Sequence, residues 1–342
     1  MNNLLRVIII ATSSVLFLGC SQANKIENTD GLTMNKFDHM KNWCIGRYSF
    51  QVPKTAIITD QTSSDKYDSF RIKSELAVSI DRFHEEIARV EKESTSFEDD
   101  YIKDQTKVEM HGKTVSKIIW AHSHFAQGRS AVQVFAFVYD KSKRTLFKIT
   151  GRYGKGYEAE SIASIKYLVK NLSARNNEDI PDRAGVCIFN GFIQDDGKEF
   201  KYSNQQTTFK FKEWPSVKVT METEATTKVL QNLIDRTTTN LRASAFGATA
   251  LAKLKTLRKG EKNQDNVPAL QGQEWIIKSP MKGRNGIDAK WEHTGTASNG
   301  LDPLIQLEVK SGHDNIETDS ASISEQEAYF LYEKILNSIK KF

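Results

Sequence analysis

Apolar and polar residues alternate along several short stretches of the chain, and this period of two predicts β-strands. The sequence DKSK at 140–143 predicts a hairpin turn between two of them. In the first half, the predicted strands cover residues 44–52, 113–125, 131–139 and 145–150. In the second half, strands are predicted from residue 187, within 209–223, and at 274–278, 287–293 and 304–310.

Other stretches have the 3.6-residue period of amphipathic helices. Within 81–94, Phe83, Ile87 and Val90 share one face, and Glu85 and Arg89 lie four residues apart on the solvated face. Apolar spacing predicts further helices at 157–173, 224–237 and 243–258. The chain ends in the clearest helix, which begins with a capping box of Ser324 and Glu327.

The two halves have the same order of elements. Each begins with a strand led by a cysteine and ends with an amphipathic helix, and the polar segment NNEDIPDR at 176–183 separates them. We therefore predict an α+β fold of two similar domains, each a mostly antiparallel sheet packed with helices. The predicted boundaries are an N-terminal domain at 41–175, a linker at 176–185 and a C-terminal domain at 186–342.

The N-terminus has the pattern of a secreted lipoprotein. A basic start, MNNLLR, precedes the apolar run VIIIATSSVLF and the sequence LGC. Gly19 before Cys20 resembles a lipobox, although Phe17 departs from its usual aliphatic residue. We predict a signal peptide at 1–19, lipidation of Cys20 and a tether at 20–40, and Ser21 favours anchoring in the outer membrane on the periplasmic side. The alternative is an ordinary signal peptide with a chance cysteine.

Lipidation of Cys20 leaves Cys44 and Cys187, an even number in an oxidising compartment. A disulfide would tie the first strands of the two domains together. The alternative is that both are small buried apolar residues, and the sequence leaves both interpretations open.

Composition excludes some partners and agrees with a folded two-domain chain. Hydrophobic residues make up 39% of the sequence and charged residues 27%. The formal net charge is +5, but the charges are mixed along the chain. Because no basic stripe is present, no nucleic-acid partner is predicted.

Candidate catalytic motifs are incomplete. HEEIA at 84–88 has Ala88 where a zinc protease needs a second histidine, and His122 and His124 lack an identifiable third ligand. GRYGKG at 151–156 is followed by Tyr157 and Glu158 in place of the P-loop lysine and hydroxyl residue. No G-x-S-x-G elbow occurs, and the S-x-x-K spacings at 63–66 and 338–341 lack partner motifs. We therefore predict no catalytic residues, metal, cofactor or small-molecule substrate, and no enzymatic activity.

Four segments carry a resemblance to a known family. They are CIGRYSFQVP at 44–53, GVCIFNGFI at 185–193, LKTLRKGEKN followed by LQGQEW at 254–275, and the C-terminal ISEQEAYFLYEKILNSIKKF. In this order they resemble a bacterial family of two-domain immunity lipoproteins that accompany phospholipase effectors of type VI secretion. The stretch at 54–110 matches nothing in that family.

The resemblance implies a periplasmic protein that binds a cognate phospholipase effector and occludes its active-site entrance. It implies a framework for two domains but no contact residues, so the effector-binding residues stay unknown. Two alternatives remain: a lipoprotein enzyme of unfamiliar mechanism, and a structural or assembly lipoprotein of the envelope.

Overall fold

The computed structural model describes residues 35–58, 63–97, 100–122, 132–243, 255–263, 270–278, 286–312 and 322–342. The predicted signal peptide, Cys20 and His124 lie outside these residues. In the part of the chain that is described, no helix has the length and apolar character needed to cross a membrane.

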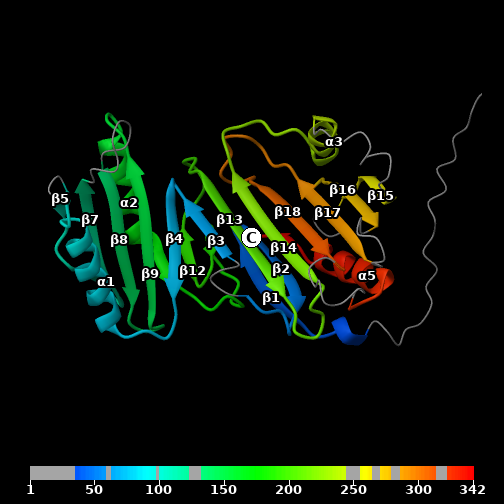
Figure 1. Cartoon of the computed structure of the whole chain (residues 1–342), viewed down its shortest axis with the longest axis horizontal. Helices are drawn as coiled ribbons and strands as arrows, with labels where there is room; N and C mark the ends of the chain where they lie inside the picture. Colours follow the sequence, from blue (N-terminus) through cyan, green and yellow to red (C-terminus); the bar gives the residue numbers. More distant parts are fainter. Residues whose placement is uncertain are drawn as a thin grey trace, which may run out of the picture.

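Thirteen strands form one sheet that runs through both halves of the chain (Figure 1). Every strand pairing among the described residues is antiparallel. From the centre outward, the N-terminal half contributes β3 (Ser63–Tyr67), β4 (Phe70–Glu75), β9 (Thr145–Tyr153), β8 (Val132–Asp140), β7 (Thr114–His122) and β5 (Tyr101–Gln105), and β6 (Glu109–His111) pairs with β7. The C-terminal half contributes, again outward, β13 (Ser203–Lys210), β14 (Lys218–Ala225), β18 (Leu304–Lys310), β17 (Ile287–His293), β16 (Gln273–Lys278) and β15 (Thr256–Glu261).

Two small sheets complete the strands. One contains β1 (Met40–Ile45), β2 (Tyr48–Pro53) and β19 (Lys340–Lys341), and follows a short 3-10 helix, η1 (Asn35–Phe37). The other contains β10 (Leu172–Ala174), β12 (Gly191–Gln194) and β11 (Gly185–Ile188). Each small sheet is a hairpin with one short strand added: β19, from the end of the C-terminal half, joins the hairpin of β1 and β2, and β10, from the end of the N-terminal half, joins the hairpin of β11 and β12.

The helices cover opposite faces of the main sheet. They are α1 (Ile80–Glu93), α2 (Glu158–Asn171), α3 (Leu233–Ala243) and α5 (Glu325–Leu336). Successive residues of a strand point to opposite faces. In β7, Ile119 packs with α1, whereas Ile118 belongs to the cluster of α2. In β17, Glu292 pairs with Arg236 of α3, whereas Trp291 packs with α5.

The same alternation places α2 and α5 on one face and α1 and α3 on the other. Phe209 of β13 packs in the cluster of α5, and Tyr67 of β3 packs in the cluster of α2. Ser203 lies directly opposite Tyr67, so these two residues point to the same face of the sheet. Ser203 and Phe209 are six residues apart on one strand and therefore also share a face. Both clusters thus lie on one face. The other face carries α1 near one end and α3 near the other (Figure 1).

The two hairpins are exchanged between the halves. Trp43, Tyr48 and Phe50 of the first hairpin pack with α5 in the C-terminal core. Val186 and Ile193 of the second hairpin pack with α2 in the N-terminal core. The α+β class is confirmed, but the segments predicted as separate domains at 41–175 and 186–342 each place their first hairpin in the other's core. The reason is strand pairing, since β2 pairs with β19 and β12 pairs with β10.

Strongly periodic elements were predicted correctly. The strands at 287–293 and 304–310 and the helix near 81–94 lie where the pattern indicated. In the C-terminal helix, the Ser324 side chain accepts from the Glu327 N–H, and the Glu327 side chain accepts from the Ser324 N–H. This capping box satisfies two donors that a helix start otherwise leaves open.

Three predicted elements were wrong. Residues 44–52 form two strands, because Gly46 turns the chain with φ +54°, and a side chain there would meet Thr223. The helix predicted at 224–237 begins only at Leu233, and Val229 is 90% exposed. Thr256, Leu257 and Arg258, predicted as helical, lie in β15, while residues 244–254 lie outside the described part. In the first and third cases pairing with a neighbouring strand decided the conformation, since β1 pairs with β2 and β15 pairs with β16.

Cys44 and Cys187 form a disulfide with their Cα atoms 5.8 Å apart, the first of the two interpretations left open by the sequence. The bond joins β1 to β11. Beside it, the Gly46 N–H donates to the Cys187 carbonyl, and the Cys187 N–H donates to the Gly46 carbonyl. The neighbours of Cys44 pack in the C-terminal core and those of Cys187 in the N-terminal core. The disulfide therefore connects the two hydrophobic cores.

Asp65 of β3 provides a pH-dependent contribution to stability. Its carboxylate is buried and accepts from the Phe189 N–H at 3.1 Å. Burial raises the pKa of Asp65 to about 7, although the Phe189 N–H and the charge of Arg175 act in the opposite direction. An unfolded aspartate titrates near pH 3.9. Between these values the folded protein holds one proton more than the unfolded chain.

Because the folded protein binds this extra proton, we expect the free energy of unfolding to fall as the pH rises from about 4 to about 7, by at most about 1.4 kcal/mol per pH unit. Asp65→Asn removes the titration and should flatten that slope, as measured by urea denaturation across the range. The exposed Asp182→Asn serves as the control and should keep the wild-type slope. Equal slopes for Asp65→Asn and the wild type would contradict the assignment.

Candidate functional site

The candidate site is the open face, by which we mean the surface of the main sheet between α1 and α3. Of the strands that cross it, β13 and β14 alternate strictly in burial. In β13, Asn204, Gln206 and Thr208 point to this surface while their neighbours are buried, and β14 repeats the pattern. The open face is thus a broad, polar surface on a rigid sheet, flanked by one helix at each end.

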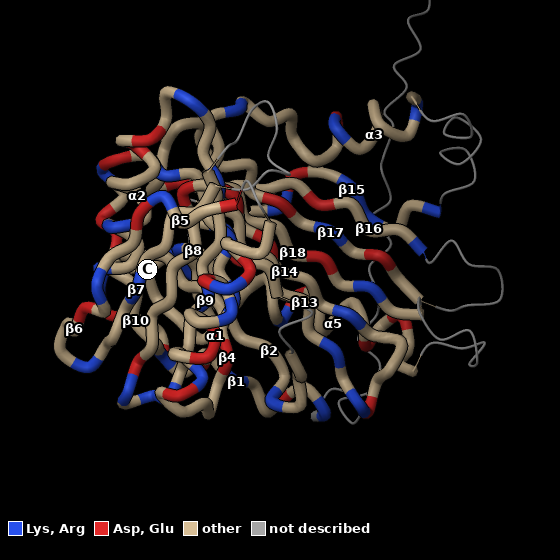
Figure 2. Tube along the Cα trace, turned by 60° about the vertical axis from the view of Figure 1, so that its left-hand side comes forward, with Lys and Arg blue, Asp and Glu red and all other residues tan. Residues whose placement is uncertain are grey.

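The charges that β17 and β18 present on the open face are matched, whereas Glu222 and Glu224 of β14 form no ion pair among the described residues, and burial together with the charge of Glu222 raises the pKa of Glu224. The amino group of Lys310 lies 3.0 Å from the carboxylate of Glu308 and 4.0 Å from that of Asp288, and Lys290 lies 3.5 Å from Glu308. Figure 2 shows both signs of charge interspersed along the strands of this half. Exposed pairs of this kind add little stability, but they leave no strong local field.

The N-terminal part of the open face contains a cationic hollow of about 500 Å³. Lys66, Arg71 and Arg152 supply its charge, and no acidic residue lines it. Lys66 and Arg71 lie directly opposite each other on β3 and β4. Within the described ranges, no ion pair joins any of these three cations to a carboxylate. The other residues lining the hollow are Ser69, Gln133, Phe135, Thr150, Gly151 and Tyr202.

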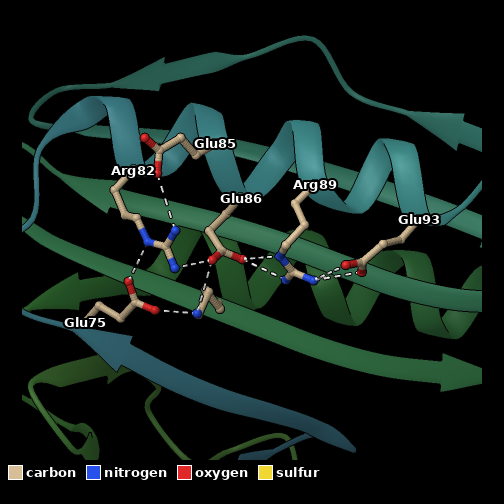
Figure 3. Close-up of polar contacts among 7 residues, drawn as sticks. Glu75, Arg82, Glu85, Glu86, Arg89 and Glu93 are labelled. Carbon is tan, nitrogen blue, oxygen red and sulfur yellow. Dashed lines mark hydrogen bonds and ion pairs between the residues drawn. The ribbon is translucent and has the colours of Figure 1, made fainter.

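An ion-pair network holds α1 in place on the same face (Figure 3). At its centre the buried Glu86 contacts Arg82 at 2.5 Å, Arg89 at 2.8 Å and Lys148 of β9 at 3.6 Å. Glu75 of β4 also pairs with Arg82 and Lys148. Burial alone would raise the pKa of Glu86, but the Arg89 hydrogen bond and the surrounding cations lower it overall. Glu86 therefore stays ionised and fastens the helix to the sheet.

In this network Glu85 and Arg89, which lie four residues apart on the helix, do not pair with each other. Arg89 does not pair with Glu85 but with Glu86 and with Glu93. Glu85 instead lies 3.4 Å from Arg82. The two glutamates of the HEEIA segment, Glu85 and Glu86, thus form ion pairs with arginines of the same helix. Their carboxylates serve to position α1.

At the other end, α3 is fixed by fewer contacts. The Ile234 N–H donates to the Gln273 side chain at 3.2 Å, and Arg236 pairs with the fully buried carboxylate of Glu292. Leu233 is the buried apolar residue of this helix. Both flanking helices therefore rest on strand residues of the open face.

The residues weighed for catalysis are not brought together. His122 stacks on Tyr101, and the Ser338 hydroxyl donates to the Ile335 carbonyl. Within the described ranges, no group of three or more His, Cys, Asp or Glu side chains is placed to hold a metal ion.

The residues of the cationic hollow were not predicted as a site. Lys66 and Arg71 come from the stretch at 54–110 that matched nothing in the immunity family, where Lys66 ends the rejected S-x-x-K spacing, and Arg152 comes from the rejected GRYGKG segment. Their proximity depends on the pairing of β3 with β4 and of β4 with β9. A single sequence gives no signal for that pairing.

Comparison with solved structures shows a fold that is already known. The chain resembles the apo structure of the immunity protein TplEi of T6SS from Pseudomonas aeruginosa with a TM-score of 0.71, at 20% identity, over 88% of this chain and 97% of that one. The same immunity protein complexed with "L" peptide gives a TM-score of 0.69 at 20% identity, over 89% and 99%. The Tle4–Tli4 complex gives 0.72 at 20% identity, over 89% and 98%. The chain thus has the fold of type VI secretion immunity proteins.

Residues 179–341 match the family model described as Tle cognate immunity protein 4 C-terminal domain. This segment is therefore a domain of that immunity family, and the resemblance found in the sequence is confirmed. No curated protein sequence matches the chain.

Proposed function

We propose that this protein is an immunity protein that binds a cognate type VI secretion phospholipase effector and inhibits it by covering its active-site entrance. The match of residues 179–341 to the Tle cognate immunity family carries the proposal. The shared fold with an immunity protein solved in the Tle4–Tli4 complex supports it. An inhibitor of this kind needs a rigid surface of about 800 Å² and no catalytic group, which agrees with the open face.

The two halves are, in this proposal, copies of one unit. From the centre of the sheet outward, β3, β4, β9, β8, β7 and β5 correspond to β13, β14, β18, β17, β16 and β15. In each half a helix follows the second strand along the chain and another follows the last long strand. By this correspondence α1 matches α3, so the open face lies between two equivalent helices that can hold one effector.

The location is likewise a proposal. The lipobox-like LGC sequence supports lipidation of Cys20 and attachment to a membrane facing the periplasm. The polar residues after Cys20 give the folded part a tether to that membrane. An inhibitor held there would meet a phospholipase at the lipid that the phospholipase attacks.

Titration of an effector tests the proposed function. The mature chain from residue 21 is added to the phospholipase effector encoded beside it, and phospholipid hydrolysis is followed. We expect activity to fall in proportion to the added chain and to end at a fixed stoichiometry, with a complex stable to gel filtration. Unchanged hydrolysis and no complex would contradict the proposal and favour the envelope-assembly alternative. Lipid turnover by the chain alone would favour an enzyme.

A further inference from the structure

We infer that the cationic hollow formed by Lys66, Arg71 and Arg152 is the docking site for an acidic segment of the effector. The inference rests on the proposed function and adds to it a position on the molecule and a chemistry for the partner. Three features carry it: the register of the strands, the contrast with the paired lysines of β17 and β18, and the shape of the hollow.

The strand register places like charges together at a cost. Lys66 and Arg71 are direct cross-strand partners, an arrangement that destabilises a sheet. Arg71 lies opposite Thr150, two residues from Arg152, so the third cation is added on the next strand. None of the three forms an ion pair with a carboxylate among the described residues; Lys66 acts on the more distant carboxyl of Glu224 only through its charge, which opposes the rise in the pKa of that carboxyl. Lys290 and Lys310, by contrast, have acidic partners on neighbouring strands. An anionic partner would relieve the repulsion.

The shape and the groups present indicate a protein segment. Arginine presents a planar fork that binds a carboxylate through two parallel hydrogen bonds, and the hollow contains two arginines. Phe135 and Tyr202 line the same hollow and offer apolar area to the stem of a glutamate or to a neighbouring side chain. Phe135 also packs against the cluster that seats α1, so the hollow lies beside that helix.

A lipid headgroup is the less suitable anion. The cations line a concave surface on the sheet, and a bilayer is flat. The residues that line the hollow with them are mostly polar, and its two aromatic side chains are half-buried. A membrane-binding surface would instead project basic and apolar side chains together.

Charge reversal tests the inference. Arg71→Glu/Arg152→Glu in the mature chain should weaken binding of the effector at least about tenfold, because like charges then meet across the interface. The wild-type affinity should fall as salt is added, and the variant should lose most of that dependence. Isothermal titration calorimetry at several salt concentrations measures both.

The matched control reverses the same number of charges elsewhere. Lys166→Glu/Lys170→Glu changes two exposed residues of α2, on the opposite face of the sheet, and should bind like the wild type. Tight binding by the Arg71/Arg152 variant would overturn the inference while leaving the proposed function intact. Failure of the wild type to bind would overturn both. Arginine-dependent binding to vesicles of phosphatidylglycerol and phosphatidylethanolamine, without an effect on the effector, would also overturn the inference.

Discussion

Loss of the Cys44–Cys187 disulfide should lower the free energy of unfolding by about 2–5 kcal/mol. The two cysteines are 143 residues apart in sequence, so the bond restricts a very large part of the unfolded chain. It also joins the two cores at the point where the hairpins are exchanged. Guanidinium denaturation of Cys44→Ala/Cys187→Ala against the oxidised wild type measures the effect.

Reduction of the wild type provides the control. Both cysteines are buried, so alanine also removes some packing, and this loss must be separated from the loss of the bond. The wild type in reductant keeps both sulfur atoms in place and should show most of the same decrease. If the reduced and oxidised proteins unfold at the same denaturant concentration, the bond contributes nothing to stability.

Arg47→Ala should destabilise the protein by about 3–5 kcal/mol, because it leaves a buried carboxylate without its cation. The Arg47 guanidinium lies 2.8 Å from the carboxylate of Asp195, and both side chains are about 95% buried. It also donates to the carbonyls of Gly300 and Gly185. One side chain thus joins the first hairpin, the second hairpin and the loop before β18.

Two further variants make the Arg47 prediction specific. Arg71→Ala removes an exposed arginine without an ion pair and should unfold close to the wild type. Arg47→Met/Asp195→Leu removes both charges and should recover part of the loss, since a buried pair replaced by apolar groups often costs little. Equal stability of Arg47→Ala and the wild type in thermal denaturation would show that the pair is not needed.

The sequence was informative where a pattern is local. The C-terminal helix was predicted from its capping box and apolar stripe, and the structure has both. The strands at 287–293 and 304–310 were predicted from alternation alone. These elements were predicted correctly because the residues that define each of them are close together in the sequence, within a few helical turns or on a single strand.

The exchange of hairpins was not predicted, for a physical reason. CIGRYSFQVP has the apolar pattern of a core strand, but nothing in it says which core. That choice depends on the pairing of β2 with β19, almost 300 residues later. The family resemblance was also carried by these framework residues, so it identified the class of protein and not its binding surface.

The exchange also means that the first residues of the folded part are among the last to find their native partners. The first hairpin reaches its core only when β18 and α5, near the C-terminus, have been made. Until then Trp43, Tyr48 and Phe50 have no native partners, and a chain dominated by such distant contacts folds slowly. A nascent or truncated chain that stops before α5 can therefore assemble the N-terminal core, whose last residue is Ile193, but it leaves the apolar side chains of the first hairpin exposed to chaperones and proteases.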